Sequence, residues 1–151
     1  MARVIGLVFV LAIGSGHAAS PDTAVLAVAG RANANPSIAA AGAFVAVTWA
    51  ATGERGTDIY VAASSDAGRT FRSPVLVKGS TGANVSGEQP PRVVLSPRAG
   101  RAPDVVVVWT SKAATGTRLL SARSEDGGRR FSTPTCRARR CSSCTRRSSG
   151  P

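Results

Sequence analysis

The sequence predicts an all-β protein built from two similar four-stranded units. A motif of the form Ser-x-Asp-x-Gly-x-x-Phe occurs twice, at 64–71 and at 124–131. The offset between the two copies, from Asp66 to Asp126, is the same as the offset from Trp49 to Trp109. Runs of Val, Ile and Leu accompany each motif, and 16 glycines and 9 prolines punctuate the chain. One fixed offset indicates an internal repeat, and this composition is typical of strands joined by tight turns.

The first unit is expected to contain four strands separated by turn residues. Apolar and β-branched runs predict these strands at 35–39, 43–50, 58–63 and 71–78, with Gly42 in the first turn. A further short strand is expected at 23–29, because its sequence matches that of the fourth strand. This match predicts that the chain enters with the outermost strand of a preceding unit.

The second unit repeats this pattern. Strands are predicted at 91–95, 104–110 and 117–123, and a fourth begins at Phe131. The loop at 96–103 is longer than its counterpart by five residues, as expected of a surface loop. The four valines at 105–108 form a continuous apolar run, which is typical of a strand buried on both faces. Trp49 and Trp109 are expected to fill the space between stacked units; exposed stacking on a sugar is the alternative.

The first motif has the chemistry of a tight turn between two strands. Asp66 can accept hydrogen bonds from backbone N–H groups of the turn, and Gly68 can adopt a positive φ. Ser64 and Thr70 are placed to hydrogen-bond across the neck of the hairpin, and Phe71 brings a large apolar side chain to bury.

The second motif assigns the same parts to Ser124, Asp126, Gly128 and Phe131. Arg130 stands where the first motif has threonine, which weakens one hydrogen bond and keeps the turn chemistry. Because bonded carboxylates are common in turns, we expect the aspartates of both motifs to be structural acids and not catalytic ones.

The repeated motif resembles the Asp-box, also called the BNR repeat, of sialidase-like β-propellers, and the resemblance covers roughly 23–134. It implies a partial β-propeller: about two four-stranded Asp-box blades of a six-bladed propeller, blade one at about 36–79 and blade two at about 90–134. Six blades of this length would need on the order of 360 residues, so the chain is expected to be a truncated member of the family. The family implies exo-α-sialidase-type glycoside hydrolysis, with an arginine triad, a tyrosine–glutamate pair and an aspartate acid/base.

That catalytic set is not found in the sequence. The Arg-Ile-Pro motif of true sialidases does not occur, and Tyr60, the one tyrosine, has Leu120 as its repeat partner, which favours packing. Arg92 begins an inner strand and is the arginine best placed to bind a carboxylate in a central channel. Arg92 and Tyr60 are therefore the two catalytic candidates. The alternatives are a non-catalytic propeller piece that binds a sialoglycan-like carbohydrate or a protein, and an inactive frame-shifted product.

The N-terminus predicts export. Arg3 precedes an apolar run at 4–13, and small residues follow up to Ser20, which is the layout of a signal peptide at 1–19 cleaved after Ala18 or Ala19. The propeller region then spans 20–134, in a secreted, extracellular or periplasmic protein with no stable membrane span after cleavage; an uncleaved anchor is the alternative. The one histidine, His17, leaves with this leader, so neither a metal site nor a cofactor is expected.

The last segment, 135–151, has a different character. It contains all three cysteines, in spacings that do not complete a four-ligand zinc site, and no Val, Ile, Leu or aromatic residue. We expect it to be disordered or out of frame, and unable to supply an outer strand.

The charge does not indicate a nucleic-acid partner. The net charge is +11, but five arginines lie in the final segment and the others are scattered between strands. Because two blades leave apolar faces uncovered, self-association or aggregation is expected.

Overall fold

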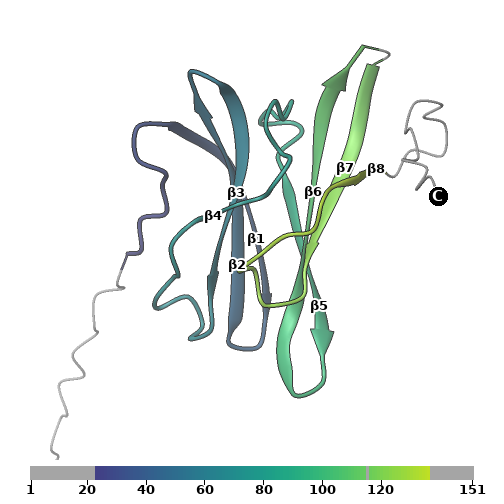
Figure 1. Ribbon diagram of the computed structural model, residues 1–151. Coiled ribbons are helices and arrows are strands. Elements are labelled where there is room, and N and C mark those ends of the chain that lie inside the picture. Colours follow the sequence, from purple (N-terminus) through teal and green to yellow (C-terminus); the bar gives the residue numbers. More distant parts are fainter. Residues whose placement is uncertain (1–22, 115, 137–151) are drawn as a thin grey trace, which may run out of the picture.

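The computed structural model describes residues 23–114 and 116–136 and is all-β (Figure 1). These residues form two four-stranded antiparallel sheets and no helix. The first sheet contains β1 (Ala32–Ala41), β2 (Phe44–Gly53), β3 (Gly56–Ser64) and β4 (Val75–Leu76). The second sheet contains β5 (Arg92–Arg98), β6 (Arg101–Ala113), β7 (Gly116–Ser124) and β8 (Thr135–Cys136). No helix that could cross a membrane occurs in the described part of the chain. The predicted signal peptide and most of the final segment lie outside it.

The two sheets repeat each other in backbone register. Strands follow the chain order within each sheet, because short turns join antiparallel neighbours. Val45 pairs with Ser64 in the first sheet, and Val105 pairs with Ser124 in the second. The offset that separates the two motifs in the sequence is therefore also the offset between equivalent strand pairs.

The fourth strands are shorter than predicted, and that of the second sheet lies in a segment that was expected to supply none. Pairing with β3 is confined to Val75–Leu76, within the predicted range 71–78. In the second sheet Leu120 pairs with Cys136, so the expectation that the chain from Thr135 could not supply an outer strand is wrong. A strand at the edge of a sheet pairs through backbone groups, and a cysteine and a threonine provide these as well as valine does.

Two other expectations are wrong. Residues 23–28 form no strand. Leu26 and Val28 of this segment pack their side chains on the outside of the first sheet. No strand that precedes this segment is described, so the segment has no such partner with which to pair. The predicted loop at 96–103 is mostly strand: β5 continues to Arg98 and β6 begins at Arg101, and these two residues pair. The extra residues therefore lengthen a hairpin.

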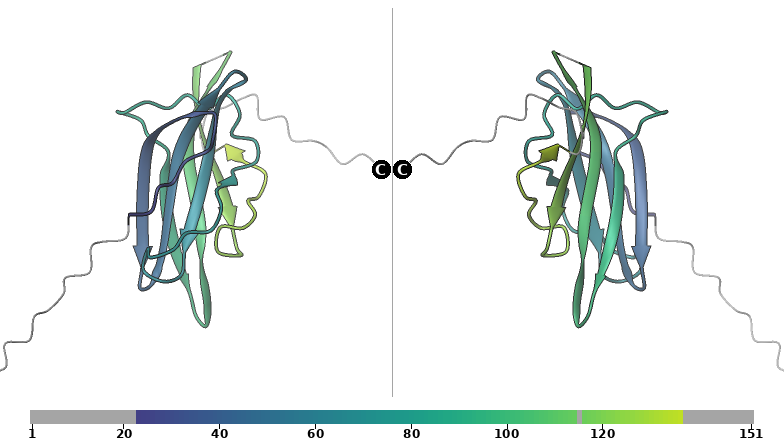
Figure 2. Two further views of the ribbon diagram at one scale, coloured as in Figure 1. Left: turned by 90° about the vertical axis from the view of Figure 1, so that its left-hand side faces the viewer. Right: turned by 90° about the vertical axis from the view of Figure 1, so that its right-hand side faces the viewer.

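The sheets pack face to face around one shared core (Figure 2). The first sheet contributes Ile59 and Val61 among others, whereas the second contributes Val105, Val107 and Trp109. Burial of Trp109 here confirms the prediction that it fills the space between units.

The sheets are stacked in the same orientation, so that the contact joins two different faces of the repeated unit and not two equivalent faces. Ile59 of the shared core corresponds, in the second unit, to Leu119, which is exposed on the far side of the second sheet. Trp109 of the core corresponds to Trp49, which belongs to a separate cluster on the far side of the first sheet. The two sheets thus bury different, not equivalent, faces in the shared core. We call the two sides that point away from the shared core the outer face of the first sheet and the outer face of the second sheet.

Candidate functional site

The first motif folds into a hydrogen-bonded turn after β3. The Ser64 hydroxyl donates to Asp66 Oδ1 (2.6 Å) and accepts from the N–H of Gly68 (2.9 Å). Thr70 donates its N–H to Asp66 Oδ1 (2.9 Å) and its hydroxyl to Asp66 Oδ2 (2.5 Å). Bonds from Ser64 and then Thr70 hold the pKa of Asp66 well below its usual range, because they favour the carboxylate form. Gly68 has a φ of 85°.

The second motif forms the same turn after β7. The Ser124 hydroxyl donates to Asp126 Oδ1 (2.7 Å) and accepts from the N–H of Gly128 (2.8 Å). Asp126 Oδ1 also accepts from the N–H groups of Arg129 (2.9 Å) and Arg130 (3.0 Å). Burial acts to raise the pKa of Asp126, but these bonds outweigh it and the pKa is lowered. Arg130 has no hydroxyl with which to repeat the bond that Thr70 makes.

The two motif aspartates are therefore occupied by their own turns. Each carboxylate accepts bonds from a serine hydroxyl two residues earlier and from backbone N–H groups up to four residues later. Phe71 packs on the outer face of the first sheet, and Phe131 packs against the shared core.

The catalytic candidates Arg92 and Tyr60 are not brought together. Arg92 is exposed and pairs with Val108, so it lies on the outer face of the second sheet. Tyr60 lies on the outer face of the first sheet, where its ring stacks on Trp49 with 6.3 Å between ring centroids. Both sheets stand between the two side chains, and stacked sheets are about 10 Å apart.

Tyr60 is held by a polar cluster that the sequence analysis did not identify. The Arg31 guanidinium lies 5.7 Å from the centre of the Tyr60 ring and donates to Asp58 Oδ2 (2.5 Å). The Thr81 hydroxyl donates to Asp58 Oδ1 (2.7 Å), so both carboxylate oxygens are engaged. The bond from Asp58 raises the pKa of Arg31. This pairing fixes Arg31 against the sheet and occupies both oxygens of the carboxylate nearest to Tyr60 along β3.

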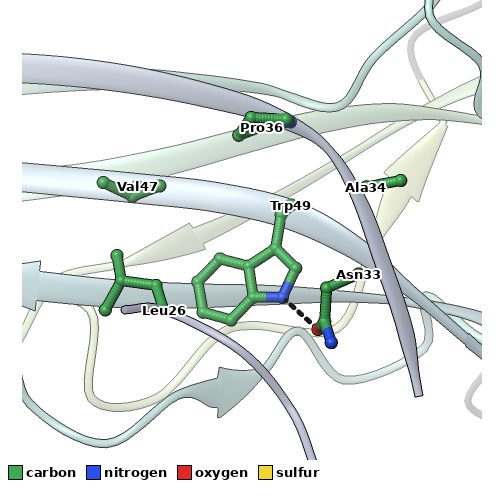
Figure 3. A pocket seen from close by; sticks show the side chains of 6 residues that line it. All are labelled: Leu26, Asn33, Ala34, Pro36, Val47 and Trp49. Atoms are coloured by element: carbon green, nitrogen blue, oxygen red, sulfur yellow. Dashed lines mark hydrogen bonds between the residues drawn. The ribbon is translucent and has the colours of Figure 1, made fainter. Parts of the chain in front are cut away.

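A pocket of about 120 Å³ opens beside Trp49 on the outer face of the first sheet (Figure 3). Its walls are Leu26, Asn33, Ala34, Pro36, Val47 and Trp49. Asn33 Oδ1 accepts from Trp49 Nε1 (2.9 Å) and from the N–H of Val28 (2.9 Å). Asn33 Nδ2 donates to the carbonyls of Val28 (3.1 Å) and Arg31 (2.8 Å). Its amide and the indole N–H are thus already used, and the pocket offers an apolar surface.

The outer face of the second sheet carries a larger apolar pocket, of about 360 Å³. It is lined by Val94, Val106, Val108, Leu119, Leu120 and Ser121. Val94 and Leu119 are 55% and 44% exposed, respectively. The run at 105–108 is therefore fully buried on one side only: Val105 and Val107 face the shared core, whereas Val106 and Val108 are half-buried.

One end of this face is charged. Asp104 is fully buried, and its Oδ2 accepts from Arg98 Nε (2.8 Å) and from Arg123 Nη2. Arg123, and after it Arg98, lowers the pKa of Asp104, and the same contact raises the pKa of Arg123. Asp104 Oδ1 has no hydrogen-bond partner within the described residues. The sequence signal that could have indicated this network is the position of Asp104, directly before the apolar run at 105–108.

No group of three potential metal ligands gathers in the part of the chain that the structure describes. The chain matches no model of a known protein family, no curated protein and no solved structure.

Proposed function

We propose that this chain is an exported, non-catalytic pair of blades of the Asp-box (BNR repeat) propeller type, related to the sialidase-like propellers, and that it acts as an interaction module. The observation that carries the proposal is the same-orientation stacking of two meander sheets in one repeat register. Propellers repeat their blades around an axis, so each blade turns the same face toward the next. A two-sheet sandwich that buried equivalent faces would place Trp49 and Trp109 in one core, and these residues lie in two clusters.

The position of the inner strands supports the same proposal. Between the two sheets, the most extensive contact is made by β1 and β5, the first strand of each sheet. Radially arranged blades approach each other most closely at their first strands, which lie nearest to the axis.

Glycoside hydrolysis is the less favoured function. Acid/base work on a glycosidic bond needs two carboxyl groups roughly 5 to 10 Å apart across the bond, and a tyrosine nucleophile needs an adjacent base. Here the motif aspartates are bonded within their turns, and Tyr60 packs against both Trp49 and Arg31. Carbohydrate binding at the Trp49 pocket is not favoured either, because sugar hydroxyls need free polar groups and those of Asn33 are used.

A fluorogenic sialoside assay tests this proposal. We expect the purified chain to release the fluorophore at the background rate, and the variants Arg92→Ala and Tyr60→Phe to give the same rate as the unmodified chain. A known sialidase assayed in parallel shows that the substrate is competent. Turnover above background that either substitution abolishes would establish an enzyme and overturn the proposal.

A further inference from the structure

The outer faces of the two sheets carry exposed aliphatic side chains. The residues at the equivalent positions of the other sheet are buried in the shared core. Ile38 is 68% exposed, whereas Val93, which holds the same place in the second sheet, is 6% exposed. Leu119 is 44% exposed, whereas its first-sheet equivalent Ile59 is fully buried. These two positions are therefore covered where the other sheet lies against them and exposed where no sheet does. Trp49, on the outer face of the first sheet, is already covered by a cluster that includes Leu26 and Val28.

The shared core shows which surfaces fit each other. The second sheet inserts Val107, Trp109, Leu120 and Ala122 into it, and the equivalent residues on the outer face of the first sheet are Val47, Trp49, Tyr60 and Ala62. The first sheet receives them with Ala46, Ala50, Ile59 and Val61, whose equivalents on the outer face of the second sheet are Val106, Thr110, Leu119 and Ser121. One outer face thus repeats the inserting surface, and the other repeats the receiving surface.

We propose that the chain binds a second copy of itself head to tail, with the outer face of the first sheet of one copy packed on the outer face of the second sheet of the other. This interface continues the stacking that already joins the two sheets within one chain. This docking rests on the proposed function in one respect: the proposed interaction module needs a partner, and the docking identifies that partner as a second copy of the chain.

The segment before β1 is compatible with this docking. Leu26 and Val28 pack beside Trp49, and Ala83 and Val85 from the β4–β5 connection pack within the shared core that contains Trp109. A connecting segment beside the tryptophan is therefore already a component of the internal interface, and it does not have to leave when another sheet docks.

The charged end of the second sheet makes the new interface differ from the internal one. Asp104 and Arg123 stand where the first sheet has Phe44 and Ala63 in the shared core. These two groups pair with each other, so the apolar contact is centred on the pocket that Val94, Val106 and Leu119 line. The interface is heterologous, because it joins two different surfaces, and such interfaces generate closed rings or open chains.

Size-exclusion chromatography with light scattering, over a range of concentrations, tests the docking with one charged variant for each face. Ile38→Glu places a carboxylate on the first-sheet face, and Leu119→Glu places one on the second-sheet face. We expect the unmodified chain to form oligomers as its concentration rises. Each variant alone should weaken association by at least roughly tenfold, because a carboxylate without a partner is costly to bury.

Mixing the two variants is the decisive step. The Leu119→Glu chain keeps an intact first sheet and the Ile38→Glu chain keeps an intact second sheet, so an equimolar mixture should form a one-to-one dimer that grows no further. Ser65→Glu is the matched control: Ser65 is exposed in the turn after β3 and its repeat equivalent is already a glutamate, Glu125, so this variant should associate like the unmodified chain. Circular dichroism confirms folding, and Ile38→Ser with Leu119→Ser replaces the pair if the glutamates unfold the chain.

Three results would overturn the docking: an unmodified chain that stays monomeric at every concentration, a variant mixture that forms no dimer, or non-specific aggregation that all three substitutions leave unchanged. A monomeric chain without sialidase activity would leave the proposed function standing. Sialoside turnover would remove the proposed function and leave the oligomer measurement to decide the docking by itself.

Discussion

Ala67 and Gly127 hold the same place in the two turns, and both adopt a left-handed backbone conformation. The φ of Ala67 is 61° and that of Gly127 is 70°. An L-residue with a Cβ is strained by roughly 1–2 kcal/mol in this region, and glycine is not. The backbone N–H of Ala67 nevertheless donates to the carbonyl of Ala43 (2.8 Å), which holds the residue in place. The first turn therefore stores strain that the second turn avoids.

Ala67→Gly should stabilise the chain. Relief of the left-handed strain exceeds the added entropy of the unfolded chain, so we expect a gain of about 0.5–1 kcal/mol in the free energy of unfolding. The converse substitution, Gly127→Ala, should destabilise, because its Cβ would lie 3.1 Å from the Cβ of Ala102. Urea unfolding of both variants provides the measurement. Equal stability of Ala67→Gly and the unmodified chain would mean that the turn tolerates the conformation without strain.

The two motif turns are the elements that connect the third and fourth strands of each sheet. The second turn also takes part in sheet stacking, since Arg72 Nη1 of the first unit donates to the carbonyl of Gly127 (3.3 Å). A Cβ on Gly128 would lie 3.6 Å from the Cβ of Ala63, so this turn rests directly on the first sheet. Loss of its shape affects both the local hairpin and the packing between the sheets.

Asp66→Ala and Asp126→Ala should each lower the melting temperature by roughly 5 to 15 °C, because backbone N–H groups of the turn lose their acceptor. Asp66→Asn keeps one acceptor oxygen and should have a smaller effect. Ser65→Ala, at an exposed position that makes none of these bonds, is the control. Differential scanning calorimetry measures the change, and a variant that melts normally but loses its association would instead make these acids part of a binding surface.

Acid should weaken the same turns. The pKa of Asp66 is lower in the folded chain than in the unfolded chain, so its contribution is fully present above the unfolded value, about 3.9. The contribution is lost as pH falls below that value toward the folded pKa. The melting temperatures of the unmodified chain and of Asp66→Ala are therefore expected to converge only in strongly acidic solution.

At the scale of the whole molecule, the repeat spacing predicted most of the fold. Trp49 and Trp109 placed the two units in register, and the long strands of both sheets contain the predicted ranges almost entirely. The edge strand at Thr135 was missed because the pattern of apolar residues indicates which side chains are buried, whereas pairing at a sheet edge depends on backbone groups. The cluster of Arg31, Asp58 and Thr81 was missed because its members come from three separate segments, and their approach depends on the folded sheet.

Export is a prediction for the full chain. The apolar run at 4–13 should direct secretion, and the mature N-terminus should lie near Ala19 or Ser20. N-terminal sequencing of the secreted protein provides the measurement, and Val8→Arg, which interrupts the run, should retain the chain inside the cell. Secreted material that still begins with Met1 would argue for an uncleaved anchor.

The same-orientation stacking has a consequence for how such a chain can change its length. Every unit presents one inserting and one receiving surface, so a gene segment that encodes one repeat can be duplicated in tandem and its product meets a compatible neighbour on both sides. The new copy meets a related apolar surface, which differs from the internal one mainly at the charged end formed by Asp104 and Arg123. A fold that buried equivalent faces would have no place for a third sheet, and each gain would require a new surface. Growth by whole units is thus available to this architecture from a single recombination event.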